Sequence, residues 1–140
     1  MNEATKAIIK STAPILKSKG EEITSTMYPI LFERFPETKE LFKNAEPSQY
    51  KKLANAVWAY ADNIDRLENL SAGIETMAMA HIKTSVKPEH YPMVGEALLE
   101  AISKVLGDDA TEEVIAAWGE AYGFLANVLI ARETELYAKA

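Results

Sequence analysis

The stretch Met77-Ala78-Met79-Ala80-His81-Ile82, with His90-Tyr91-Pro92 shortly after it, decides how this chain is interpreted. The chain contains only two histidines in 140 residues. His81 falls on the apolar stripe of a predicted helix, because apolar residues stand three, four and seven positions before it. An imidazole on an apolar face costs free energy unless its nitrogens find partners. Two interpretations stay open: a core histidine satisfied by a backbone carbonyl, or a metal ligand for a large, flat, apolar cofactor.

The composition excludes several classes of protein. The 140 residues predict one domain, 1–140, large enough for a hydrophobic core. The formal net charge of −6 argues against a nucleic-acid partner, because phosphate binding needs a basic face. The absence of cysteine excludes disulfides, thiolate metal sites and iron–sulfur clusters. No apolar run approaches the ~20 residues of a transmembrane helix, and residues 1–6 lack the features of a secretory signal. We therefore expect a cytoplasmic protein without membrane insertion.

Hydrophobic periodicity predicts helices along the whole chain, and no segment alternates as a strand would. Gly20 is expected to end the first helix, which Pro14 should kink or split. Asp109 and Glu112 have the spacing of a capping box at the start of the last helix. The expected helices cover about residues 3–19, 21–35, 36–42, 47–65, 71–85, 88–106 and 110–137, with a loop over 43–47. Seven helices with proline-marked corners predict an all-α fold whose helices cross at large angles, not a four-helix bundle.

Short segments spread over nearly the whole chain carry a more specific pattern. They are Ile8-Ile9-Lys10-Ser11-Thr12 with Pro14, Phe35-Pro36-Glu37 with Leu41-Phe42, Lys52-Leu53-Ala54, Asn63-Ile64 with Leu67, His90-Tyr91-Pro92 with Val94-Gly95, Val105-Leu106-Gly107, Ala117-Trp118-Gly119 and Ala121-Tyr122-Gly123. In their order and spacing the chain resembles bacterial single-domain globins of the flavohaemoglobin-like class. The resemblance implies a globin fold of about seven helices around one haem b (iron protoporphyrin IX), held between the 47–65 helix and the His81 helix.

On the proximal side, the resemblance implies that His81 is the ligand of the haem iron. It implies that Tyr91 and Glu133 hold this histidine in a hydrogen-bonded network. A carboxylate that accepts from the imidazole makes the ligand more electron-donating, which favours oxygen activation over storage. From the residues alone, Glu133 could equally be an ordinary exposed acid among charged neighbours. His90 stands beside two prolines and is interpreted as a corner residue, not a ligand.

On the distal side, the resemblance implies that Phe42 wedges against the porphyrin and that Leu53 lies one turn beyond the distal glutamine, Gln49. Tyr28 matches the distal tyrosine whose hydroxyl donates to bound dioxygen. A donor to a charged acceptor is worth about 1.5–3 kcal/mol. Tyr28 could also be a boundary tyrosine, and Gln49 could be solvated, because Tyr50 stands where this class commonly has proline. The other expected haem contacts are Tyr91 and the valines Val57, Val86 and Val94.

Two functions follow from the resemblance. The first is reversible binding of dioxygen for transport or storage, with nitric oxide and carbon monoxide as further gaseous ligands. The alternative is an enzyme, a nitric oxide dioxygenase, which consumes one electron in each cycle. No Gly-rich dinucleotide loop occurs in these 140 residues, so sustained turnover would need a separate reductase. A gas sensor would need a signalling domain that these residues do not contain.

Overall fold

The structure is a computed structural model, and it describes residues 1–43, 45 and 48–139. This part of the chain is helical throughout and contains no strand, so the expected all-α class is confirmed. Its α-helices are α1 (Glu3–Arg34), α2 (Gln49–Asp62), α3 (Ser71–Lys83), α4 (His90–Leu106) and α5 (Glu112–Lys139). Its 3₁₀ helices are η1 (Pro36–Phe42), η2 (Leu67–Leu70) and η3 (Gly107–Asp109).

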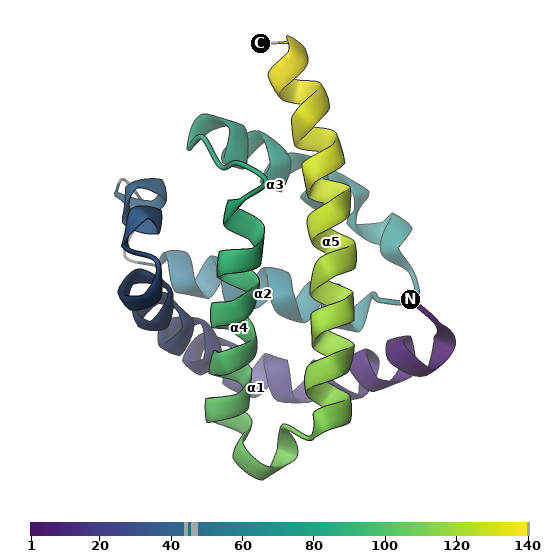
Figure 1. The fold of residues 1–140 in the computed structure, drawn as a ribbon. Coiled ribbons are helices and arrows are strands. Elements are labelled where there is room, and N and C mark those ends of the chain that lie inside the picture. The colour runs from purple at the N-terminus through teal and green to yellow at the C-terminus, as the bar shows by residue number, and fades with distance from the viewer. Residues whose placement is uncertain (44, 46–47, 140) are drawn as a thin grey trace.

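The helices cross in two groups (Figure 1). The helices α4 and α5 lie side by side, joined by the short turn that contains η3. Behind them, α1 and α2 run across the pair, and α1 contacts α2, α4 and α5. The helix α3 lies at the end of this arrangement near the C-terminus and packs against α5. The crossing arrangement agrees with the expectation drawn from the proline-marked corners.

The prediction that Gly20 ends the first helix and separates it from a second one was wrong. A single helix, α1, runs through Pro14, Gly20 and Pro29. Both prolines are exposed, so the carbonyls that lose a partner can bond to water. Gly20 is buried, and a Cβ added there would lie 3.4 Å from the Cβ of Ala54 in α2. The glycine therefore permits close contact between α1 and α2 and does not end the helix.

The other expected helices are present with shifted ends. The structure begins α2 at Gln49 and ends it at Asp62, whereas residues 44, 46 and 47 of the expected 43–47 loop lie outside the described residues. The capping box at the last helix was wrong, because Asp109 belongs to η3. The cap is Thr111, whose hydroxyl accepts from the backbone N–H of Val114 at 3.2 Å. Capping signals two residues apart compete, and local spacing does not select between them.

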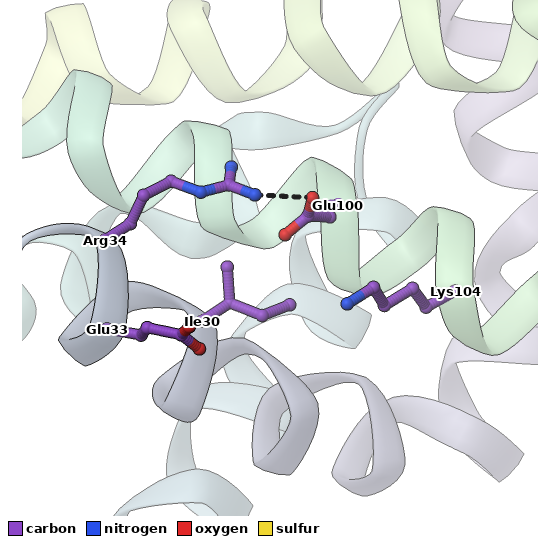
Figure 2. Close-up of a pocket in the computed structure, with 5 residues that line it drawn as sticks. All are labelled: Ile30, Glu33, Arg34, Glu100 and Lys104. Carbon is purple, nitrogen blue, oxygen red and sulfur yellow. Dashed lines mark hydrogen bonds and ion pairs between the residues drawn. The ribbon is translucent and has the colours of Figure 1, made fainter.

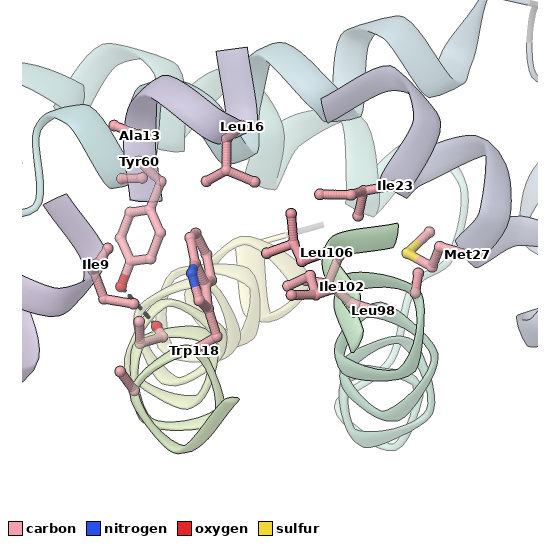
Figure 3. Packing of buried hydrophobic residues seen from close by; sticks show 14 of the residues in the cluster. Ile9, Ala13, Leu16, Ile23, Met27, Tyr60, Leu98, Ile102, Leu106 and Trp118 are labelled. Atoms are coloured by element: carbon pink, nitrogen blue, oxygen red, sulfur yellow. Dashed lines mark hydrogen bonds between the residues drawn. The ribbon is translucent and has the colours of Figure 1, made fainter. Parts of the chain in front are cut away.

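The main hydrophobic core lies where α1 crosses α4 and α5 (Figure 3). Most of its buried side chains come from α1, α4 and α5, and α2 adds Tyr60 and Ala61. Those of the first three helices include Ile9, Leu16, Ile23, Met27, Leu98, Ile102 and Trp118. Each large aliphatic side chain buried here contributes about 1.5–3 kcal/mol. The polar atoms inside the core are paired: the Tyr60 hydroxyl donates to the Ala121 carbonyl at 2.7 Å, and Trp118 Nε1 donates to Thr12 Oγ1 at 3.2 Å.

The helix α5 is more apolar than the sequence analysis allowed. By length and composition it could cross a membrane, because Glu120 is the only charged residue between positions 114 and 131. A core helix passes the same test, and α5 contacts α1, α3 and α4. The fold buries 28% of its most apolar stretch, so packing inside the helical fold accounts for part of its apolar character.

Candidate functional site

The side chain of His81 meets groups from two other helices. Its Nδ1 atom lies 2.9 Å from Glu133 Oε2 on α5 and 2.9 Å from the Tyr91 hydroxyl on α4. The Tyr91 hydroxyl donates to both carboxylate oxygens of Glu133, at 2.8 and 2.7 Å. The Glu133 side chain is only 4% exposed, so its interpretation as an ordinary exposed acid was wrong. Three helices thus fix one imidazole nitrogen.

The direction of these hydrogen bonds follows from the chemistry of the groups. An ionised carboxylate only accepts, so the imidazole carries its proton on Nδ1 and donates to Glu133. Burial, and next the hydrogen bond to Glu133, raise the pKa of Tyr91 well above its usual range, so this hydroxyl is a neutral donor. Within the described residues, His81 Nε2 has no hydrogen-bond partner, and the side chain is 28% exposed.

Tyr122 on α5 supports this network through Tyr91, a role that the sequence did not predict. Its hydroxyl donates to the backbone carbonyl of Tyr91 at 2.7 Å. The ring fits because position 95 is glycine: a Cβ there would lie 2.7 Å from Tyr122 Cε2, a distance that real atoms do not adopt. Gly95 therefore lets α4 and α5 approach closely enough for Tyr122 to reach Tyr91. The sequence contains both Gly95 and Tyr122, but their spacing does not show that the two residues are in contact.

A second group of side chains surrounds Tyr28 on α1. Its ring contacts the Phe42 ring edge-on at 5.2 Å and the Phe32 ring at 5.9 Å, measured between centroids. Burial raises the pKa of Tyr28 to about 12, while a hydrogen bond from Gln49 lowers it. Gln49 is the first residue of α2, and its side chain reaches Tyr28, so it is not simply solvated.

The apolar residues expected at a cofactor are half-buried. Each packs on one side against a buried cluster and keeps another side uncovered. Those against the main core are Phe42, Leu53, Val57 and Val94, and the one against the smaller cluster around Tyr91 is Val86. His90 behaves as the expected corner residue: its Nδ1 accepts from the Lys87 backbone N–H at 2.9 Å.

Residues 25–129 match the family model described as Globin. The chain is a globin. Over 99% of its length it is 54% identical to an uncharacterized globin-like protein from Aquifex aeolicus, of which it covers 99%. Over its full length it is 45% identical to a flavohemoprotein from Rhizobium meliloti, but it covers only 36% of that protein. This globin therefore spans about a third of the flavohemoproteins that it matches.

Solved structures agree with the family. A bacterial globin from Campylobacter jejuni superimposes with a TM-score of 0.89 at 38% identity, covering 98% of this globin and 99% of that chain. An engineered carbene transferase, made from a candidate nitric oxide dioxygenase of Rhodothermus marinus, gives 0.94 at 43% identity. That match covers 99% of this globin and 96% of that chain. The predicted resemblance to single-domain globins and flavohaemoglobin domains is confirmed.

Membership of this family implies haem binding, and the residues of this globin fit a haem. An imidazole with Nδ1 fixed by a carboxylate and Nε2 outside any hydrogen bond among the described residues is the arrangement of a histidine metal ligand. The half-buried apolar side chains suit a flat, apolar ring. Within the described part of the chain, no three His, Asp or Glu side chains cluster as a metal site of their own. The single imidazole nitrogen and the apolar side chains suit a metal carried by a porphyrin.

A pocket of about 530 Å³ lies elsewhere, between α1 and α4 (Figure 2). Charged side chains dominate its lining: Glu33, Arg34, Glu100 and Lys104, with Ile30. Arg34 Nη2 lies 2.6 Å from Glu100 Oε1, so these charges satisfy one another. An open pocket lined mainly by charged side chains does not suit an apolar cofactor, and none of its residues belongs to the His81 network.

Proposed function

We propose that this globin binds haem b, that His81 Nε2 would hold its iron, and that the protein binds dioxygen reversibly. The observation that carries this proposal is the hydrogen bond of 2.9 Å between His81 Nδ1 and Glu133 Oε2. It fixes the tautomer, so the lone pair of Nε2 is the one available to a metal. The proposed haem contacts are Phe42, Leu53, Val57, Val86, Tyr91 and Val94, which are half-buried except for the buried Tyr91.

Haem supplies the iron that takes up dioxygen. The part of the protein is to favour dioxygen over less polar gases by a hydrogen bond. With a pKa raised to about 12, Tyr28 stays protonated at neutral pH. The Gln49 amide donates to the phenolic oxygen, so the hydroxyl proton remains available for a ligand. We propose that Tyr28 is the donor to dioxygen and that Gln49 orients it.

We propose nitric oxide dioxygenation as the second function. Conversion of one nitric oxide to one nitrate takes both atoms of dioxygen and one electron. The carboxylate on the proximal imidazole favours it, because a more electron-donating ligand promotes oxygen activation. The Rhodothermus marinus relative is described as a candidate nitric oxide dioxygenase. These 140 residues contain no Gly-rich dinucleotide loop, so the electron has to come from outside them, and we propose a reductase as its source.

Absorption spectra of the purified protein test the first proposal. We expect the spectra of a haem protein in the oxidised and reduced states, with distinct shifts when dioxygen or carbon monoxide is added. His81→Ala should lose the haem or bind it weakly. His90→Ala, which removes the other histidine and keeps His81, should retain the haem. Retention of normal spectra by His81→Ala, with loss in His90→Ala, would show that the ligand is assigned wrongly.

A further inference from the structure

The backbone that follows His81 is held in an unusual conformation. The segment between α3 and α4, residues 84–89, follows the last turn of α3, which carries His81, and leads to Tyr91 in α4. Ser85 lies in the left-handed region with φ 63°, which costs a non-glycine residue free energy. After this turn, the backbone N–H of Val86 donates to the carbonyl of His81 at 3.0 Å. Val86 is therefore linked directly to the backbone of the histidine.

The other side of the same residue is held by α5. The hydroxyl of Tyr137 donates to the carbonyl of Val86 at 2.7 Å. The Nζ atom of Lys87 lies 4.2 Å from the centroid of the Tyr137 ring, which adds a cation–π contact to the same segment. Burial, and next the negative charge of Glu133, raise the pKa of Tyr137, so the hydroxyl keeps its proton.

Tyr137 stands one helical turn after Glu133, so both face the same side of α5. Glu133 holds the ring of His81 at Nδ1. Tyr137 holds the backbone of the same histidine through Val86. A backbone that is fixed at one atom and strained at Ser85 can relax when its second attachment is removed.

We propose that Tyr137 is a positioning residue for His81: its hydrogen bond to the Val86 carbonyl holds the strained turn at Ser85 and sets the imidazole against Glu133. The backbone part of this inference stands on contacts alone. Its consequence for an iron ligand rests on the proposed function. Amide hydrogen exchange measures the first, and resonance Raman spectroscopy measures the second.

Tyr137→Phe is the variant that tests the backbone part, because it removes one hydroxyl and keeps the ring under Lys87. The matched control is Tyr60→Phe, which removes a hydroxyl bond of the same length, between Tyr60 on α2 and the Ala121 carbonyl on α5, away from the turn at Ser85. Amide hydrogen exchange at Val86 should speed up roughly two- to tenfold in Tyr137→Phe, the worth of one neutral hydrogen bond, and stay unchanged in Tyr60→Phe. Equal exchange in the wild type and Tyr137→Phe would overturn the proposal, whatever the protein binds.

Ser85→Gly provides a rescue, because glycine adopts a positive φ without strain. In the double variant Tyr137→Phe with Ser85→Gly, exchange at Val86 should return toward the wild-type rate. If Ser85→Gly leaves the exchange at Val86 equally fast or makes it faster, Tyr137 does not act by restraining a strained turn at Ser85.

The consequence for the ligand is measured by resonance Raman spectroscopy of the reduced haem form. Tyr137→Phe should move the iron–histidine stretching band to lower frequency, toward its position in Glu133→Gln, while Tyr60→Phe leaves it in place. A merely structural loss would affect both tyrosine variants alike. An unmoved band together with faster exchange at Val86 would overturn the positioning role. A protein with no haem at all would instead contradict the proposed function, while the exchange experiment still tests the backbone contact.

Discussion

Glu133 Oε2 lies 2.9 Å from His81 Nδ1, although 52 residues separate the two side chains in sequence. A second contact between the same helices explains how this distance is kept: Arg132 donates through Nε and Nη2 to the Glu75 carboxylate, with distances down to 2.7 Å. Arg132 and Glu133 are adjacent in α5 and contact different residues of α3. Together they tie α5 to α3 at two points, which limits how far the histidine and its carboxylate can separate.

Removal of the carboxylate charge should change the redox properties of the protein. Glu133→Gln keeps the size of the side chain but makes His81 a weaker electron donor, so the oxidised haem loses stabilisation. The reduction potential should rise, as measured by spectroelectrochemical titration. Glu135→Gln is the matched control, since Glu135 is an exposed acid two residues away that pairs with Arg132. Equal shifts in both variants would indicate a general charge effect and no specific role for Glu133.

Tyr28→Phe should weaken the retention of dioxygen. The change removes only a hydroxyl, so the ring contacts with Phe32 and Phe42 remain. Loss of a charge-assisted hydrogen bond should speed dioxygen dissociation about ten- to a hundredfold. Dissociation of carbon monoxide should change less. Stopped-flow measurement of both rates decides the point, and equal effects on the two gases would indicate a steric cause.

The raised pKa of Tyr28 predicts an alkaline loss of stability. In the unfolded chain this hydroxyl ionises near 10.0, whereas in the folded protein its pKa is about 12. Between these values the folded state binds more protons, so the stabilising contribution is complete below pH 10 and disappears as the pH rises toward 12. Urea unfolding at a series of pH values should show a steeper alkaline decline for the wild type than for Tyr28→Phe. An identical alkaline decline of the unfolding free energy in both proteins would show that ionisation of Tyr28 does not cause it.

Gly95→Ala should destabilise the protein and disturb the hydrogen bonds around His81, although residue 95 is not one of their partners. The new Cβ would meet Tyr122 Cε2 at 2.7 Å, so the ring must move and its hydrogen bond to the Tyr91 carbonyl is strained. Overpacking of this kind costs about 1–3 kcal/mol. Gly123→Ala is the control, because a Cβ there meets nothing within 4 Å. Urea denaturation measures both, and similar losses would mean that glycine is needed only for backbone reasons.

Nitric oxide should be consumed once, rapidly, and then no further without a reductase. The first mixing of the oxygenated protein with nitric oxide needs no added electron, but each later cycle does. Stopped-flow mixing followed by a steady-state assay with NADH alone tests this. Several turnovers with NADH and no partner protein would reveal an unrecognised electron route. An absence of reaction in the first mixing would remove dioxygenation and leave oxygen binding as the proposed function.

Much of the fold was predictable because its signals are local. Apolar residues at helical spacing predicted α3, α4 and α5, and Pro36 marked the start of η1. The setting of His81 also came from local spacing, since its apolar neighbours lie within two helical turns. The roles of Tyr28, Gln49 and Glu133 came instead from the resemblance to known globins. Their roles in binding haem and its ligands stay predictions.

Tertiary structure decided what local spacing does not contain. Gly20 looked like the end of a helix, yet close contact with Ala54 makes it an internal residue of α1. Glu133 is one acid among several charged neighbours, and only the packing of α5 against α3 and α4 buries it beside His81. Sequence patterns report interactions between residues about four positions apart, because one helical turn brings only those together. The contacts that build this site join residues 42 and 52 positions apart, and only the crossing of the helices creates them.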